Sequence, residues 1–247
     1  MPRLIPFRLA AACALALILS LSIVALAAAK GAPADLRVIA GQKVLAEDSF
    51  GAAKTVSIAT SPQATCFGAG TGGSGDSVTL KGATALGMLI QASKFTPALK
   101  PLQATDAFSF GLGLCGVGGF QTTKKLSWYL KVNHVNPELG GEAVKVKGGD
   151  EVLWALVPFP YPDELVLQAP PSAMPGESFQ VRVFSYDEKG KRKPAAGVKV
   201  SGAAQRTDGK GFATVTLQHP QRLSARNGSD IPSGQVAVCV GGKCLRG

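Results

Sequence analysis

The sequence predicts a mainly β protein, in which an α+β domain with a mixed sheet around one helix precedes a small β-sandwich. Short apolar runs with a period of two, separated by turn residues, fill most of the 247-residue chain. Only one segment shows apolar residues at helical spacing. A stiff, proline-rich segment, PFPYPDE at 158–164, has few backbone donors for a sheet and marks a boundary between the two halves.

The N-terminal segment, residues 1–29, has the features of a signal peptide. Arg3 and Arg8 precede an apolar run, and Ala27 with Ala29 fits a small-residue cleavage site. The alternative is an uncleaved anchor, because about 20 apolar residues can just span a bilayer. In that case the protein would contact the membrane only through this N-terminal segment. Either reading places the protein outside the cytoplasm, as a secreted or cell-envelope protein.

The exported chain is basic. Cleavage after residue 29 removes two arginines, which leaves +8 of the formal net charge of +10. Such a surface favours polyanions, and an acidic cell-envelope polymer is one candidate partner. The exposed run KGKRK at 189–193 is the loop to test first. The simpler interpretation is solubility without a particular partner. Nucleic acid is not expected, because no basic helix is present in the pattern.

Four cysteines follow the signal segment, and an even number in an exported chain predicts two disulfides. Three pairings are possible. The division into two halves favours Cys66–Cys115 and Cys239–Cys244. A zinc site is the alternative, but neither pair has the spacing of zinc ligands and both histidines lie far away in sequence.

The first domain, residues 35–158, is expected to have strands before and after its helix in sequence, which form a mixed sheet around that helix. Gly82–Ser93 is that helix, with Leu86, Leu89 and Ile90 on one face and Thr84 as a possible cap. The expected strands are 36–38, 56–58, 102–104 and 110–114, and then a three-strand meander at 126–132, 143–147 and 151–157.

The meander contains the aromatic residues of greatest interest. Trp128, Leu130 and Val132 alternate with Tyr129 and Lys131, so the two sets face opposite sides of the sheet. The last strand, EVLWALV, is apolar on both faces, which is typical of a central or doubly covered strand.

The stretch GGDEV at 148–152 shares four of its five letters with the GGDEF signature of cyclic di-GMP synthases. Export removes the chain from GTP, and Val152 stands where the signature has Phe. Asp150 and Glu151 are neighbours at the start of a strand, so they point to opposite faces and cannot act as a pair. We therefore interpret GGDEV as a tight turn into the central strand.

The second domain, residues 164–247, is predicted to be an immunoglobulin-like β-sandwich without a helix. Its turns contain APPSAMPGE, DEKGKRKPAAG and TDGKG. The expected strands are 164–169, 178–186, 198–201, 211–217, 222–225 and 235–240.

No pattern for catalysis, metal or cofactor binding emerges. GTGGSG at 70–75 precedes a strand-like DSVTL rather than a helix, so it predicts a loop and not a nucleotide site. His134 and His219 lack a partner at metal-binding spacing and are expected to be surface or loop residues. Asn227 begins a glycosylation sequon, but Asn-Gly also signals a turn, which we prefer. The chain is therefore not expected to be an enzyme.

Two family resemblances add to these expectations. Residues 35–158 resemble the transcobalamin-like C-terminal domain, through SVTLKGATALGMLIQAS, CGVGGF, WYLKVN and GGDEVLW. This resemblance implies a β-grasp fold. In the cobalamin carriers, ligand binding also depends on a helical domain that this sequence lacks, so no cobalamin-contacting residue is carried over. Residues 164–247 resemble bacterial immunoglobulin-like or carboxypeptidase-regulatory-like modules, through AAGVKVSGAAQRTDGKGFATVTL; those modules are mostly spacers or adhesion modules.

These observations favour an exported, non-catalytic binding or surface-display protein whose ligand is unknown. The alternative is a carrier for a small, corrinoid-like ligand, held by the β-grasp face around Trp128, Tyr129 and Trp154. The third possibility is an enzyme with an unrecognised site.

Overall fold

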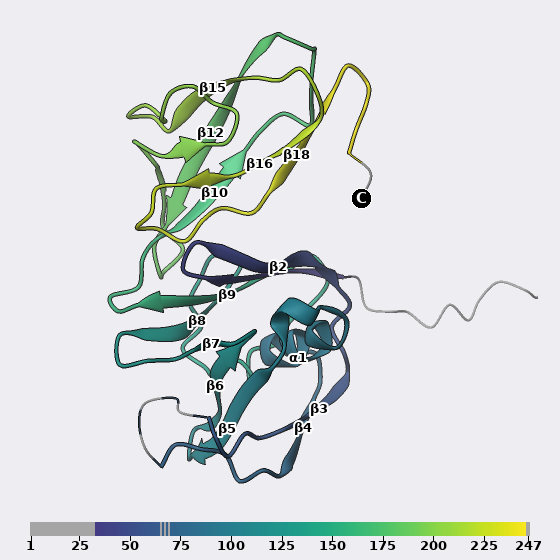
Figure 1. Ribbon diagram of the computed structural model, residues 1–247, viewed down its shortest axis with the longest axis vertical. Helices are drawn as coiled ribbons and strands as arrows, with labels where there is room; N and C mark the ends of the chain where they lie inside the picture. The colour runs from purple at the N-terminus through teal and green to yellow at the C-terminus, as the bar shows by residue number, and fades with distance from the viewer. Residues whose placement is uncertain (1–32, 65, 67, 69, 246–247) are drawn as a thin grey trace, which may run out of the picture. The chain divides into compact units, whose positions relative to one another are not determined.

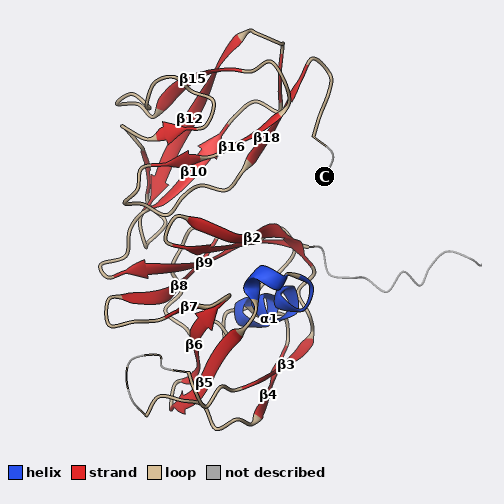
Figure 2. Cartoon of the chain, in the orientation of Figure 1, coloured by secondary structure: helices blue, strands red, loops and turns tan. Residues whose placement is uncertain are grey.

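The computed structural model describes residues 33–64, 66, 68 and 70–245, which belong to one compact unit. The predicted signal peptide, residues 1–29, lies outside the described residues. These described residues form a mainly β fold with one α-helix, as expected (Figure 2). Among the described residues, no helix has the length and apolar character needed to cross a membrane.

The central sheet of the first half has four strands in the order β2-β1-β9-β8 (Figure 1). These strands are β1 (Ala34–Ala40), β2 (Lys43–Phe50), β8 (Leu126–Val132) and β9 (Glu151–Pro158). β1 and β9 run parallel, whereas the outer pairs are antiparallel, so the sheet is mixed. Residues 152–157 of β9 are all buried, as expected for a central strand covered on both faces.

The helix α1 (Ala85–Phe95) covers one face of this sheet. It begins after Thr84, whose hydroxyl accepts a hydrogen bond from the backbone N–H of Gly87. Leu86 and Leu89 are buried in the same core as Val38 and Trp154. The first half also contains a short 3-10 helix and five further strands: η1 (Pro97–Leu99), β3 (Thr55–Ala59), β4 (Ser77–Lys81), β5 (Leu102–Phe108), β6 (Gly111–Val117) and β7 (Phe120–Gln121).

The prediction of a strand at 143–147 is wrong. β8 and β9 pair directly, and residues 143–147 make only an isolated bridge, between Lys145 and Thr84. Its backbone instead bonds to the start of the helix, since Ala85 N–H donates to Val144 and Val146 N–H donates to residue 83. The alternation of buried valines with exposed lysines is real, but β9 already has two neighbours and offers no free edge.

The second half consists of strands around a separate hydrophobic core. β12 pairs with β10, β13 and β15, while β18 pairs with β11 and β16, and β14 pairs with β17. The inner side chains of these sheets share one apolar cluster, in the manner of a β-sandwich. The strands are β10 (Glu164–Gln168), β11 (Ser172–Ala173), β12 (Ser178–Tyr186), β13 (Arg192–Pro194), β14 (Lys199–Val200), β15 (Phe212–Thr216), β16 (Gln221–Leu223), β17 (Ala225–Arg226) and β18 (Val236–Val240).

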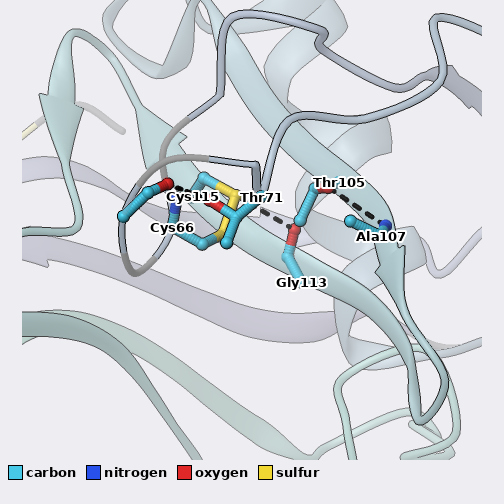
Figure 3. Close-up of a disulfide and its surroundings, with 7 residues drawn as sticks. Cys66, Thr71, Thr105, Ala107, Gly113 and Cys115 are labelled. Carbon is cyan, nitrogen blue, oxygen red and sulfur yellow. Dashed lines mark hydrogen bonds between the residues drawn. A yellow bond between two sulfur atoms is a disulfide. The ribbon is translucent and has the colours of Figure 1, made fainter.

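Both expected disulfides are present. Cys66–Cys115 joins the loop after β3 to β6 (Figure 3), and Cys239–Cys244 closes a short turn after β18. The backbone N–H of Cys66 also donates to the hydroxyl of Thr71 at 3.1 Å. Thr71 belongs to the GTGGSG segment, which is a loop followed by β4, as predicted.

Candidate binding cleft

The sheet face opposite α1 changes from charged to apolar along the strands. Cross-strand register places Ser49, Asp35 and Glu151 in one row, near the start of β1. The next row joins Glu47, Arg37, Leu153 and Lys131. The third row joins Val44, Ile39, Ala155 and Tyr129. Alternation along each strand turns all three rows toward the same face.

The apolar row is covered by residues from beyond β9. Ile39, Tyr129 and Ala155 form a buried cluster with Ile231, and the ring of Tyr161 stacks on Tyr129 at 4.0 Å between centroids. This cluster fixes the second half of the chain on one end of the sheet face.

The second row, which we call the charged row, lies around Glu164. This residue begins β10, and its side chain is almost completely buried. Arg37 forms an ion pair with one of its carboxylate oxygens. The other oxygen lies 3.4 Å from Lys131 Nζ. Lys131 is also buried, and its ammonium donates to the backbone carbonyls of Tyr186 and Asp187 at 3.0 and 2.9 Å. Buried charges require such partners, because desolvation is otherwise too costly.

Burial and charge act in opposite directions on these two groups. Burial alone would raise the pKa of the Glu164 carboxyl, but the hydrogen bond from His134 and the charges of Arg37 and Lys131 outweigh it and hold the pKa below its ordinary value. Burial lowers the pKa of the Lys131 ammonium, against the opposing effect of Glu164. The two residues therefore stabilise each other's charged forms in a dry environment.

His134 connects this buried cluster with the open part of the sheet face. Its Nδ1 lies 3.1 Å from Glu164, its Nε2 lies 3.6 Å from Glu151, and its ring stacks on Tyr186. We expected a surface or loop histidine. His134 does lie in a loop, but it is not a surface residue, because only 18% of its side chain is exposed. Its turn has left-handed backbone at Asn133 and His134, which directs the ring inward. His219 is an exposed loop residue, as expected.

Beside the charged row lies a cleft of about 830 Å³, which we call the acidic cleft. Val166, Leu167, Arg222 and Gln235, from the second half, are among the residues that line it. Five of the chain's 16 acidic residues also line it, although the chain carries a net positive charge. Four of them are exposed, namely Asp35, Glu47, Asp48 and Glu151.

Three of the exposed carboxylates accept hydrogen bonds from neighbouring residues, and the fourth, Glu151, lies beside the ring of His134. Ser49 donates from its hydroxyl to Asp35 and from its backbone N–H to Asp48. The N–H of Gln235 donates to Glu47. Among the described basic residues of the cleft, Arg37 is engaged by Glu164 and by the carbonyl of residue 232, and Arg222 is exposed without an ion pair. The cleft therefore keeps an excess of negative charge.

The three aromatic candidates lie in the core. Trp128 and Trp154 belong to the cluster that packs on α1, and Tyr129 lies on the opposite face of the sheet. Their exposed fractions are 9%, 4% and 2%, and none of them lines the acidic cleft. Trp154 donates from its indole N–H to the carbonyl of Ala85 at 3.4 Å. They stabilise the sheet and present no open face to a ligand.

GGDEV is a turn into β9. Gly149 has a φ of +82°, and the buried carboxylate of Asp150 accepts hydrogen bonds from Asn133 and from the N–H of Lys147. Burial acts to raise the pKa of Asp150, but these hydrogen bonds hold it below its ordinary value. Glu151 is exposed on the cleft side, so the two acids are separated as predicted.

The remaining motifs do not contribute to the cleft. Asn227 forms the expected turn, with its side-chain oxygen accepting from the N–H groups of Ser229 and Asp230. The basic segment 189–193 is largely exposed and continues into β13, and its Lys193 pairs with Asp163 at 2.8 Å. Within the described part of the chain, no group of three or more His, Cys, Asp and Glu residues could hold a metal ion.

Sequence reasoning missed the partnership of Lys131 and Glu164. A signal was present, because Lys131 shares a strand face with Tyr129 and pairs with an apolar position of β9. A lysine on such a face must find a buried acid, but its partner is 33 residues away in a separate strand. Only the packing of β10 against the sheet brings the two together.

Comparisons with known proteins show no family for this chain. No family model and no curated protein matches it. A crystal structure of haptocorrin in complex with Cbi is similar over 51% of this chain and 25% of that chain, with 13% sequence identity and a TM-score of 0.32. The chain thus spans about a quarter of the length of that protein.

Proposed function

We propose that the protein is an exported, non-catalytic binding protein that takes a positively charged ligand in the acidic cleft. The observation that carries this proposal is the concentration of exposed carboxylates in one concave site of a basic protein. Its volume of about 830 Å³ lies within the range of roughly 300–1,000 Å³ that ligand sites occupy. Two disulfides are compatible with a location outside the cytoplasm.

The floor of the cleft supports a cationic ligand. Asp35 and Glu151 are directly paired across the parallel strands β1 and β9, and neighbouring strands lie only about 4.8 Å apart. Like charges in this position repel each other and destabilise the sheet. A cation between the two carboxylates converts that repulsion into attraction. The site is therefore arranged for a ligand that carries positive charge.

The chemistry of the cleft supports binding rather than catalysis. His134 has both ring nitrogens directed at carboxylates, so it does not activate a serine or cysteine nucleophile. The corrinoid alternative is not carried forward, because its proposed contacts, Trp128, Tyr129 and Trp154, are buried in the core.

The test is calorimetric titration of the full-length protein with an acetylated, amidated tetralysine peptide at low and high salt. Each charge pair is worth about 1 kcal/mol at 4 Å in water, so Asp35→Asn with Glu151→Gln should weaken binding by about thirtyfold. Glu138→Gln with Glu177→Gln removes the same charge from exposed positions outside the cleft and should change the affinity by less than about twofold. Equal losses in the two variants, or no binding by the unmodified protein, would refute the proposal.

A further inference from the structure

The strand β2 forms one edge of the central sheet, and its outer side carries unpaired backbone groups. Asp35 N–H donates to the carbonyl of Asp150 at 2.8 Å, so the odd-numbered residues of β1 bond to β9. The even-numbered residues of β1 therefore bond to β2, and their partners there are Phe50, Asp48 and Ala46. It follows that the backbone of Glu47 and Ser49 points away from the sheet.

These outward groups are only partly satisfied. The N–H of Ser49 donates to the carboxylate of Asp48 at 2.8 Å. The backbone N–H and C=O of Glu47 make no hydrogen bond to another residue in the described part of the chain. Leu45 lies between the paired residues Val44 and Ala46 as the extra residue of a bulge, so pairing to β1 is interrupted there as well.

This open edge borders the acidic cleft. Six consecutive residues of the strand, 44–49, line the cleft. Successive side chains of a strand point to opposite faces of the sheet. Consecutive residues can therefore line the same cleft only if the cleft runs along the edge of the strand, where both faces are reached. The cleft therefore offers both carboxylates and unpaired strand backbone.

We propose that the ligand of the acidic cleft is an extended peptide segment rich in Lys or Arg, which adds to β2 as a further strand. This inference rests on the proposed function and specifies its ligand class. Backbone pairing to the edge supplies affinity, and side chains at alternate positions supply specificity. The five residues 45–49 span about 17 Å, enough for an equally long peptide strand.

Charge complementarity identifies the occupant. Side chains on one face of the added strand lie beside Glu47, and Asp35 and Glu151 lie on the same face one and two strands further into the sheet. Long basic side chains at every second position are therefore favoured there. Asp48, on the other face, favours a basic residue as well. A second copy of this chain pairing through its own β2 is disfavoured, because it would place acidic residues of both copies side by side.

The experiment uses the full-length protein and three fluorescein-labelled hexapeptides. The parent peptide alternates threonine and lysine. The other two carry N-methyl groups on one or the other set of alternate amides, so their charge is unchanged but only one set faces the edge of β2. Fluorescence anisotropy measures binding of all three at low salt, and the Asp35→Asn, Glu151→Gln variant repeats the series.

We expect one N-methylated peptide to bind at least about tenfold more weakly than the parent, and the other to bind like the parent. Equal binding of all three peptides would overturn strand addition and leave the cationic cleft intact. No binding of any peptide would overturn both proposals. Self-association of the protein through β2 in the absence of peptide, measured by light scattering, would assign the edge to a second copy and also overturn strand addition.

Discussion

The substitution Glu164→Gln removes the central charge of the buried cluster while preserving the shape of the side chain. Glu164 and Lys131 have exposed side-chain fractions of 2% and 1%. Removal of one partner from a buried ion pair costs about 3–5 kcal/mol, because the remaining charge is left without compensation. Glutamine still offers a carbonyl oxygen, so we expect a loss near the lower limit, about 3 kcal/mol.

Urea denaturation at pH 7, followed by tryptophan fluorescence, measures this loss, since Trp128 and Trp154 are both in the core next to the sheet. Lys193→Gln is the control. This substitution removes the ion pair between Lys193 and Asp163. The side chain of Lys193 is 65% exposed, and exposed ion pairs contribute at most about 1 kcal/mol to stability. Equal loss of stability in the two variants would refute the account of Glu164.

The coupling to Lys131 gives a second readout of the same cluster. The double variant Lys131→Met, Glu164→Gln should lose less stability than the sum of the single variants, by about 1 kcal/mol or more. The pKa of Glu164 lies below its ordinary value of 4.5, so its contribution is complete above about pH 4.5 and is lost as the pH falls through the folded-state pKa. The stability of the unmodified protein should therefore fall more steeply in acid than that of Glu164→Gln.

Two further predictions concern the covalent and packed parts of the fold. The 66–115 disulfide closes a loop of about 50 residues, so replacing both of its cysteines by serine should lower the free energy of unfolding by about 4 kcal/mol. The same replacement in the short 239–244 disulfide should lower it by about 2 kcal/mol. Equal losses in urea denaturation would contradict this difference. A methyl group at Gly141 would lie 2.6 Å from the ring of Trp154, whereas one at Gly140 would meet no atom within 4 Å. Gly141→Ala should therefore lower stability by about 1–3 kcal/mol, and Gly140→Ala should not.

The regular elements could be predicted from sequence because their causes are local. Alternating apolar residues located β1 and β12, a run apolar on both faces located β9, and the spacing of Leu86, Leu89 and Ile90 located the helix. The segment 143–147 shows the limit of this reasoning. Its alternation reflects burial of Val144 and Val146 against the core, but a strand also needs a partner, and pairing is not encoded in the segment itself.

The candidate site could not be predicted in the same way, because its parts come from distant segments. Asp35 and Glu151 are 116 residues apart in sequence, and they become neighbours only through the parallel pairing of β1 with β9. Glu164 appeared to be the first residue of a new domain, and its burial beside Lys131 follows from packing against the sheet. The aromatic residues had a strong local pattern, but that pattern indicates core.

The measurement that tests the central claim most directly is backbone amide hydrogen exchange, observed by NMR, with and without the parent hexapeptide. We predict that the amide of Glu47 exchanges freely in the unbound protein and becomes protected when the peptide adds to β2. The amides of β13, at the edge of another sheet, should not change. A Glu47 amide that stays unprotected at saturating peptide would contradict the proposal that this edge of the acidic cleft binds a strand.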